Sequence, residues 1–396
     1  MRVYADNAAT TAVSETALNA MLPLLKESYA NPSSLHSQGQ EVKERLDKAR
    51  EVFACHLHAA ETREIIFTSG GSEADNQALR SAAVIGARKG KRHIISTKFE
   101  HHAILHTLKA LEKEGFEVTL LDIPADGIIT VDQVREAIRE DTCLVTIMFA
   151  NNEIGTIQPI AEIGALCHEK GILFHTDAVQ AAGHLPIDVQ AMNIDMLSLS
   201  AHKFHGPKGV GVLYARRNIP LVNIIYGGAQ ERNRRAGTEN MPGICGAAAA
   251  FDEACNTMEE TNKKLIHMRD RLIDGLSQIP HSLLNGSREH RLPGNVHFCF
   301  EGIEGESMLL LLDAKGVAAS SGSACASGDL DPSHVLLALG RPHEVAHGSL
   351  RLSFSGYNTE EDIDHILKVV PEVVSYLREF SPVWDELEKG EKPHLI

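Results

Sequence analysis

Short apolar segments alternate with amphipathic segments through the first half of the chain, and this alternation constrains the fold more than any other feature. The apolar segments have the length of strands, and the segments between them repeat apolar residues at helical spacing. Strands are expected at 64–68, 93–97, 117–121, 143–149 and 172–176. Helices are expected between them at 72–88, 131–139 and 159–169. This order predicts an α/β fold with a mostly parallel sheet that helices cover on both faces.

The pattern changes after about residue 240. Residues 243–254 and 258–278 predict two successive helices, and residues 360–378 predict a third that is strongly periodic. We expect three regions along the chain: a large domain at 15–255, a smaller α/β domain at 256–380 that includes the N-terminal arm 1–14, and a polar tail at 381–396.

Composition excludes several classes of partner. The chain has 396 residues and a formal net charge of −15, and nucleic acid binding requires a basic face instead. No apolar run approaches the roughly 18 residues of a membrane span, and the N-terminus has no secretory segment. The seven cysteines form no Cys-x-x-Cys pair, which in a chain of this size favours reduced thiols. We therefore expect a cytoplasmic protein that binds neither nucleic acid nor a membrane.

One lysine follows directly after an expected strand. Residues 196–199 are apolar, and Gly206 and Pro207 require a turn shortly afterwards. Lys203 lies between, beside Ser200 and His202. A lysine held out of bulk water at a strand end has a lowered pKa and can bond covalently to a carbonyl group. On these residues alone, a surface lysine in a Gly/Pro turn is the favoured alternative.

Other chemistry-bearing residues also follow expected strands, and ligands of open α/β sheets bind at this edge. Gly71 and Ser72 open a helix and suit a phosphate, although Ser72 could be an ordinary helix cap. His101 could lie against an aromatic ring or only cap a helix. Asn152 could donate to a carboxylate or form an Asx turn. Asp177 could keep a pyridine nitrogen protonated, with Gln180 reaching the ring hydroxyl, or could cap a helix.

Three further residues stand out beyond residue 230. Thr238 follows Arg234 and Arg235 and suits a second phosphate contact, although a solvated turn is an equal alternative. Arg351 lies in an apolar strand and needs an anion, which could be an internal acid or the α-carboxylate of a substrate. Cys325 lies within eleven small residues, which predict a mobile loop that presents a nucleophilic thiol. Together these residues are the set that a pyridoxal phosphate enzyme with a second nucleophile requires.

At these residues the sequence resembles the cysteine desulfurases of the group that includes the NifS and IscS proteins. The motifs Ser-Ala-His-Lys-Phe-His-Gly-Pro-Lys-Gly, Arg-Ala-Gly-Thr and Ser-Ser-Gly-Ser-Ala-Cys occur together and in the family's order. The resemblance covers nearly the whole chain. It implies the fold-type I architecture of the class V aminotransferase family, pyridoxal 5′-phosphate as cofactor, and a homodimer.

The resemblance also implies roles for individual residues. Catalysis would fall to Lys203, His101 and Cys325, with Lys203 bonded to the cofactor, His101 stacked on its ring, and Cys325 attacking the substrate sulfur. The cofactor would also contact Gly71, Ser72, Asp177, Gln180, Ser200, His202 and, from the other subunit, Thr238. Asn152 and Arg351 would hold the substrate carboxylate.

The implied reaction takes sulfur from L-cysteine, releases L-alanine and leaves a persulfide on Cys325. The sulfur would pass to an iron–sulfur scaffold or another acceptor, and Cys325 could then ligate a cluster shared with that scaffold. Two alternatives remain open. Another class V enzyme, an aminotransferase or a selenocysteine lyase, would not need Cys325, and a non-enzymatic carrier would need a broken set of site residues, which this sequence does not have.

Overall fold

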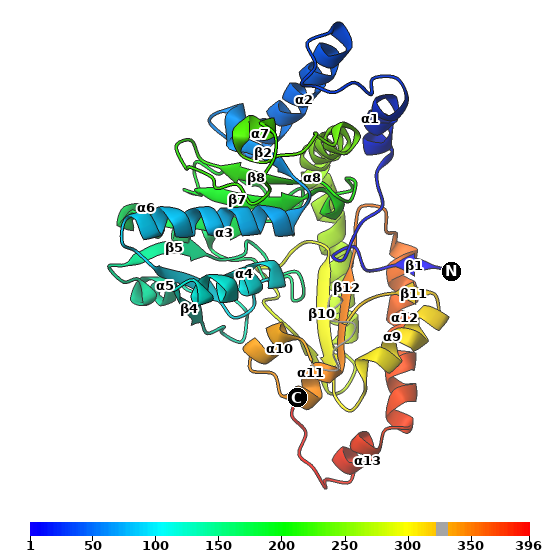
Figure 1. Cartoon of the computed structure of the whole chain (residues 1–396). Coiled ribbons are helices and arrows are strands. Elements are labelled where there is room, and N and C mark those ends of the chain that lie inside the picture. The colour runs from blue at the N-terminus through cyan, green and yellow to red at the C-terminus, as the bar shows by residue number, and fades with distance from the viewer. Residues whose placement is uncertain (322–331) are drawn as a thin grey trace.

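The centre of the protein is a seven-stranded sheet with the order β2-β8-β7-β6-β5-β3-β4 (Figure 1). The computed structural model describes residues 1–321 and 332–396. The strands are β2 (Ile65–Thr68), β3 (His93–Thr97), β4 (Glu117–Leu121), β5 (Thr142–Thr146), β6 (Leu173–Asp177), β7 (Met196–Ser200) and β8 (Gly211–Ala215). Strand β8 runs antiparallel to both of its neighbours, and the other pairs are parallel. The predicted fold class is therefore confirmed.

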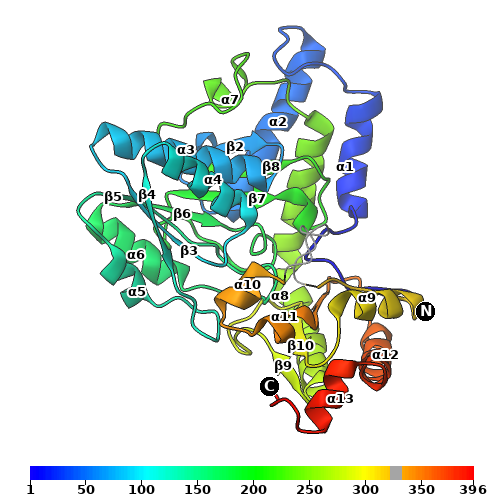
Figure 2. The same ribbon diagram turned by 60° about the horizontal axis from the view of Figure 1, so that its bottom comes forward.

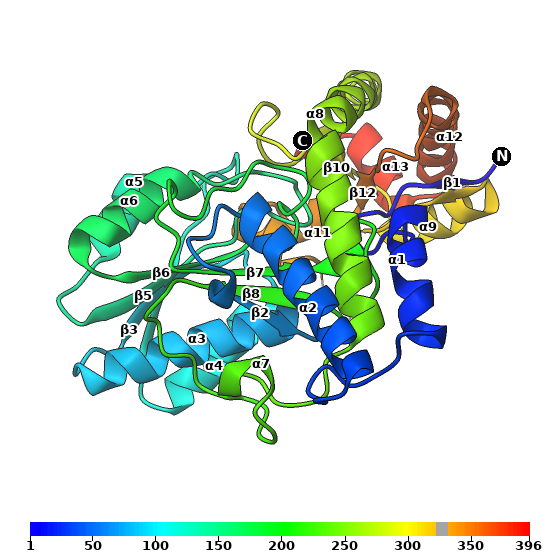
Figure 3. The same ribbon diagram turned by 90° about the horizontal axis from the view of Figure 1, so that it is seen from above.

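Helices cover both faces of this sheet (Figure 3). Alternate residues of a strand point to opposite faces, so neighbouring residues divide between two cores. Ile94 and Leu144 pack in the core formed with α3 (Gly71–Arg88) and α4 (His102–Lys113). Ile95 and Val145 pack in the opposite core, to which several helices contribute: α2 (Ser37–His56), α5 (Val131–Ala137), α6 (Ile160–Lys170) and α8 (Met241–Leu276). This two-sided burial explains why the strands are almost uninterrupted apolar runs.

A second, antiparallel sheet lies beyond helix α8. Its strands have the order β12-β10-β9, with bounds β9 (Ser282–Leu284), β10 (Asn295–Phe300) and β12 (Ser349–Ser353). They pack with α9 (Gly305–Ala314), α12 (Glu360–Glu379) and the C-terminal half of α8 in a separate core. The remaining helices are short: α7 (Gln230–Asn233), α10 (His334–Ala338), α11 (His343–His347) and α13 (Pro382–Glu388).

Helix α8 corrects one sequence-based expectation, because it is one helix of 36 residues and not two. The prediction of two helices followed from a break in apolar spacing near 255–258. No glycine or proline interrupts the chain between 247 and 274, so the backbone hydrogen bonds continue through the break. Phe251 packs in the core of the large sheet and Leu272 in the core of the small one. The predicted boundary between 255 and 256 falls inside this helix, and the division into domains stays a prediction.

The N-terminal arm joins the two sheets. Strand β1 (Val3–Tyr4) pairs in parallel with β11 (Val317–Ala318), and Asp6 forms a bridge with Ser353 of β12. The arm then crosses to the large sheet, where the Thr11 backbone N–H donates to His202 O over 3.0 Å. It ends at helix α1 (Glu15–Lys26), which Ser14 caps and which lies along α8 (Figure 2). Within residues 1–321 and 332–396, no helix is long and apolar enough to cross a membrane.

Candidate active site

The parallel strands end around a cavity of about 420 Å³. Residues that follow β2, β3, β5, β6 and β7 line it from the large sheet, while Ala8 and Ala9 of the arm and a residue of β12 close it from the other side. Ten of the residues singled out from the sequence lie on its wall: Gly71, Ser72, His101, Asn152, Asp177, Gln180, Ser200, His202, Lys203 and Arg351. The structure therefore brings together side chains that are spread over 280 positions of the sequence.

Lys203 ends a short 3-10 turn, Ala201–Lys203, that follows β7 directly. Its Nζ donates to the backbone oxygens of Ala8 and Ala9, at 2.6 and 2.8 Å. Gln180 Nε2 also donates to Ala8 O, at 3.0 Å. The N-terminal arm therefore holds the amine inside the cavity through backbone carbonyl groups, and a covalent bond to a cofactor can replace these hydrogen bonds.

Asp177 lies at the end of β6 and is almost fully buried. Burial raises its pKa, while His101, the Val179 N–H and Lys203 lower it. Asp75 of α3 lies beside it. Among the described residues its Oδ1 accepts no hydrogen bond, and it lies 3.7 Å from His175 Nε2. Burial and then the charge of Asp177 raise the pKa of Asp75 well above its ordinary value. Two adjacent buried carboxyl groups fit a ligand that brings a protonated ring nitrogen.

Two histidines lie beside this pair of carboxyl groups. Burial lowers the pKa of His175 to about 3, and its two ring nitrogens contact the hydroxyls of Thr146 and Ser198 at 2.9 and 3.0 Å. His101 caps helix α4, and its Nδ1 accepts from the Ala103 N–H over 3.1 Å. Because Nδ1 accepts this bond, Nε2 is the ring nitrogen that can carry a proton. His101 lines the cavity, as the resemblance implies for a residue that lies on the cofactor ring.

Two of the residues expected to contact a phosphate lie at the N-terminus of α3. Gly71 and Ser72 begin this helix, whose N–H groups attract anions. A Cβ at position 71 would lie 2.7 Å from Val179 Cγ2, so a larger residue there would displace the Val179 side chain. Ser200 lies at the end of β7, and burial followed by Lys203 lowers the pKa of His202 to about 4. A neutral His202 can donate one hydrogen bond to a phosphate without adding charge.

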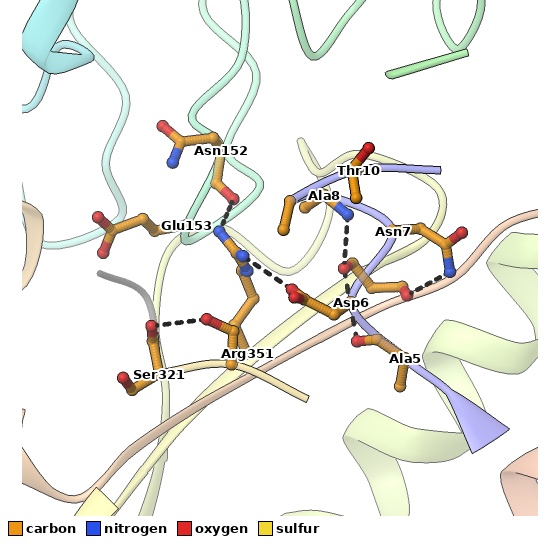
Figure 4. Close-up of polar contacts among 12 residues, drawn as sticks. Ala5, Asp6, Asn7, Ala8, Thr10, Asn152, Glu153, Ser321 and Arg351 are labelled. Carbon is orange, nitrogen blue, oxygen red and sulfur yellow. Dashed lines mark hydrogen bonds and ion pairs between the residues drawn. The ribbon is translucent and has the colours of Figure 1, made fainter. Parts of the chain in front are cut away.

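Arg351 of β12 and Asn152 also line the cavity, and Figure 4 shows the contact between them. The Arg351 guanidinium donates to Asn152 O over 3.1 Å and to Asp6 Oδ1 over 3.0 Å. The sequence left open whether an internal acid or a substrate would balance this charge, and the structure supplies an internal acid in Asp6. The contact of Asn152 with Arg351 uses its backbone oxygen, which leaves its amide available to a ligand.

Two of the expected site residues are not placed in the cavity. Thr238 is exposed and does not line it. Cys325 lies outside the described residues. The described residues on either side of it do reach the site: the backbone of Ser320 pairs with that of Arg351, and Ser333 donates its hydroxyl to Glu153. Among the other cysteines, burial raises the pKa of Cys143 and Cys299 to about 11 and that of Cys167 to about 12, which makes these thiols poor nucleophiles.

Sequence reasoning missed several residues of the cavity wall: Ala8, Ala9, Asp75, His102, Met148, Ala150, Glu153, Val179 and His334. Asp75 follows Gly71 by four positions, so helical spacing could have placed both on the same face of α3. Next to the wall, Glu100 is fully buried, and burial raises its pKa to about 8. Its position between the end of β3 and His101 could have indicated that Glu100 lies near the site. The contributions of Ala8 and Ala9 are backbone oxygens, which residue type does not reveal.

Comparisons with known proteins identify the class of protein. The model of the family described as aminotransferase class-V matches residues 3–366. The chain belongs to this family, whose cofactor is pyridoxal 5′-phosphate, and the predicted family and cofactor are confirmed. The buried carboxyl pair, the helix N-terminus at Gly71 and the Lys203 amine fit that cofactor at its ring nitrogen, its phosphate and its aldehyde.

The individual relatives are more specific. The chain is 54% identical over 394 residues to a cysteine desulfurase IscS of Clostridium botulinum, covering 99% of both chains. It is 55% identical over 381 residues to a cysteine desulfurase IscS of Methanosarcina thermophila, covering 96% of this chain and 94% of that one. Among solved structures, a NifS-like protein is 39% identical with a TM-score of 0.89, covering 95% and 100% of the two chains. A structure of SspA in complex with cysteine is 37% identical with a TM-score of 0.80, covering 91% and 100%.

Proposed function

We propose that this protein is a cysteine desulfurase that removes sulfur from L-cysteine, releases L-alanine and holds the sulfur as a persulfide on Cys325. The observation that carries the proposal is that the Lys203 amine and Arg351 line the same cavity. An α-amino acid substrate needs both residues, because its amino group must reach the cofactor at Lys203 while Arg351 holds its carboxylate. The full-length similarity to proteins named cysteine desulfurase supports this substrate.

The cofactor would be held by three groups of residues. Lys203 would bond to its aldehyde, Asp177 and Gln180 would contact its ring nitrogen and ring oxygen, and His101 would stack on its ring. Gly71, Ser72, Ser200 and His202 would hold its phosphate, with Thr238 of a second subunit. When bound, pyridoxal phosphate supplies an electron sink for the electrons of the substrate α-carbon.

The remaining steps belong to this chain's own residues. Arg351 and the Asn152 amide would hold the substrate carboxylate, and this fixes the α-carbon near Lys203. The Lys203 amine would take the α-proton and later return it. The Cys325 thiolate would attack the substrate sulfur, so that an S–S bond forms while the C–S bond breaks. The electron pair of the broken bond stays with carbon, which takes a proton and becomes the methyl group of alanine.

A homodimer is proposed as the working assembly. Helix α1 presents Leu18, Leu22 and Leu25 to solvent, at spacings that place them on one helical face. Leu35, in the segment between α1 and α2, is 94% exposed. An apolar surface of this kind is typical of a subunit interface. The outward position of Thr238 agrees with its proposed contact to the neighbouring subunit's cofactor, and sedimentation of the holoenzyme as a monomer would contradict this assembly.

The sulfur acceptor is proposed from the relatives named IscS and is an iron–sulfur scaffold or another acceptor protein, in the cytoplasm. In that exchange Cys325 would pass on its persulfide sulfur, and it would ligate a cluster only while the scaffold is bound. To test this step, the persulfide is formed from L-cysteine with radiolabelled sulfur and the protein is mixed with a cluster-free scaffold. The label should then move from this protein to the scaffold.

The sulfur-transfer reaction is tested by a pulse of L-cysteine followed by mass spectrometry of the peptides. Wild-type protein should carry one added sulfur on the peptide that contains Cys325, and alanine should form. Cys325→Ala should keep the cofactor absorbance but lose the persulfide and almost all alanine. Cys55→Ala is the matched control, because Cys55 is an exposed free thiol away from the cavity. Wild-type alanine formation by Cys325→Ala would contradict the mechanism and favour a lyase or an aminotransferase.

A further inference from the structure

Asp6 forms an ion pair with the Arg351 guanidinium, the group that the proposed function assigns to the substrate carboxylate. The Arg351 side chain is 2% exposed, and its ion pair with Asp6 spans 3.0 Å. The two residues are 345 positions apart and meet because Asp6 forms a bridge with Ser353, two residues beyond Arg351 on β12. Figure 4 shows the guanidinium between the Asp6 carboxylate and the Asn152 backbone oxygen. The positive charge of the substrate end is therefore already balanced by the protein itself.

The Arg351 guanidinium still has capacity for another anion. Its Nε has no hydrogen-bond partner in residues 1–321 and 332–396. Each of its two terminal nitrogens donates one hydrogen bond to these residues, although each carries two N–H groups. A substrate carboxylate can therefore approach the same guanidinium. It would then lie within a few ångströms of the Asp6 carboxylate, and two like charges at that distance repel each other.

The Asp6 side chain can give up this contact without unfolding the arm. It is 21% exposed, and Arg351 is its one hydrogen-bond partner among the described side chains. The backbone at Asp6 is held separately, because its oxygen accepts from the Ala9 N–H over 3.0 Å and its strand position bridges Ser353. Rotation of the side chain toward water would therefore leave the Ala8 and Ala9 oxygens beside Lys203 in place.

We propose that Asp6 is an internal carboxylate that competes with the substrate α-carboxylate for Arg351 and so sets the affinity of the site for carboxylate-bearing ligands. In the absence of substrate it balances a buried charge that would otherwise destabilise the fold. When a carboxylate ligand binds, Asp6 weakens or releases its own contact. This inference rests on the proposed function only for the assignment of Arg351 to the carboxylate, and not for the sulfur chemistry.

The test compares wild type with Asp6→Asn, which removes the charge but keeps an oxygen that can accept from Arg351. Binding of L-alanine to the holoenzyme is followed through the cofactor absorbance. Because a like charge is removed at a partly exposed site, the dissociation constant should fall by about fivefold. Cysteamine, which has an amine and a thiol but no carboxylate, should bind both proteins equally within about a factor of two, because it makes no contact that depends on the charge.

Asp364→Asn is the matched control, because Asp364 also pairs with an arginine, Arg271, but lies away from the cavity. The dissociation constants of L-alanine and cysteamine should be the same for Asp364→Asn as for wild type. Unchanged or weaker binding of L-alanine by Asp6→Asn would overturn the inference, and weaker binding would make Asp6 a residue that only orients Arg351. If Asp6→Asn gained as much affinity for cysteamine as for L-alanine, the inference would also be overturned.

The same titration separates this inference from the proposed function. If wild-type protein binds L-alanine but forms no persulfide from L-cysteine, the desulfurase assignment fails while the effect of Asp6→Asn can still be measured. If cysteine turnover and persulfide formation are as proposed but Asp6→Asn binds L-alanine as wild type does, only the role of Asp6 fails.

Discussion

Two parts of the cavity balance buried charge in different ways: the part around Lys203 and Asp177, called the cofactor end, and the part around Arg351, called the substrate end. At the cofactor end, Asp75 and Asp177 are buried carboxyl groups with raised pKa values, burial lowers the pKa of His175, and carbonyl oxygens hold the Lys203 amine. At the substrate end, a buried arginine is already paired with a carboxylate. The cofactor end thus needs a ligand to complete its charge balance, whereas the substrate end is balanced without one.

This difference matches what each end must bind. A resident cofactor stays through many turnovers, so a site that is electrostatically incomplete without it favours tight retention. A substrate must bind and leave in every cycle, so a site that has an internal substitute for the ligand avoids an unpaired buried charge between turnovers. The following predictions test the comparison, from the largest expected effect to the smallest.

Removing the amine at the cofactor end should abolish the reaction. Lys203→Ala should lower cysteine desulfuration by about 10³-fold or more, because both the covalent bond to the cofactor and the proton-transferring group are lost. The visible absorbance that borohydride removes should also disappear. Lys208→Ala, an exposed lysine of the same loop, is the control and should retain both. A borohydride-sensitive band in Lys203→Ala would contradict the assignment.

Removing the arginine at the substrate end should affect binding and spare the cofactor. Losing one partner of a buried charged pair costs about 2–5 kcal/mol, so Arg351→Ala should raise the KM for cysteine by about 30-fold or more. The cofactor absorbance should stay as in wild type. Arg271→Ala removes an arginine of a surface ion pair and should leave KM unchanged. A normal KM in Arg351→Ala would make the Arg351–Asp6 pair purely structural.

Removing a hydroxyl from the phosphate region should weaken cofactor retention alone. A hydrogen bond to a charged group contributes about 1.5–3 kcal/mol, so Ser72→Ala should weaken pyridoxal phosphate binding by about 10-fold or more. The KM of the reconstituted enzyme for cysteine should change little. Ser69→Ala, three residues earlier and not on the cavity wall, is the control. If the two variants retain the cofactor equally, the Ser72 hydroxyl does not contact the phosphate.

The smallest effect concerns the stability of the cofactor end. Burial raises the pKa of Glu100 to about 8 from an unfolded value near 4.5, so the folded state holds a proton that the unfolded state releases. Its contribution to stability is complete below pH 4.5 and is lost as the pH rises toward 8. Glu100→Gln keeps the acceptor for the Met148 N–H but does not titrate. Its melting temperature should exceed that of wild type by about 2 °C at pH 8 and not at pH 5.

A contrary outcome would be a variant that is less stable at pH 8 than wild type. Glu100 would then be ionised in the folded protein, and the cofactor end would tolerate more negative charge than its burial suggests. Calorimetry of the cofactor-free protein at the two pH values is the measurement, because a bound cofactor adds its own pH dependence.

Much of the cofactor end could be predicted from the sequence, since its residues follow strand ends within a few positions. Gly71, His101, Asp177 and Lys203 each come directly after an apolar run, and parallel strands bring their carboxyl ends to one edge. Asp75 could have been predicted from helical spacing, but its raised pKa depends on burial and on Asp177, which only the packed structure provides. The single helix α8 was missed because local apolar spacing says little about a helix that serves two cores.

The sequence by itself determined the α/β class, the family, the cofactor and the set of strand-end residues, because these depend on local patterns and motifs that are read within short windows. Only the tertiary structure decided which anion balances Arg351, which groups hold Lys203, and that Thr238 faces outward. The physical reason is separation along the chain: Asp6 lies 345 residues from Arg351, and Ala8 lies 195 residues from Lys203. Contacts over such distances follow from how the N-terminal arm pairs with β12 and crosses to β7, which no local pattern encodes.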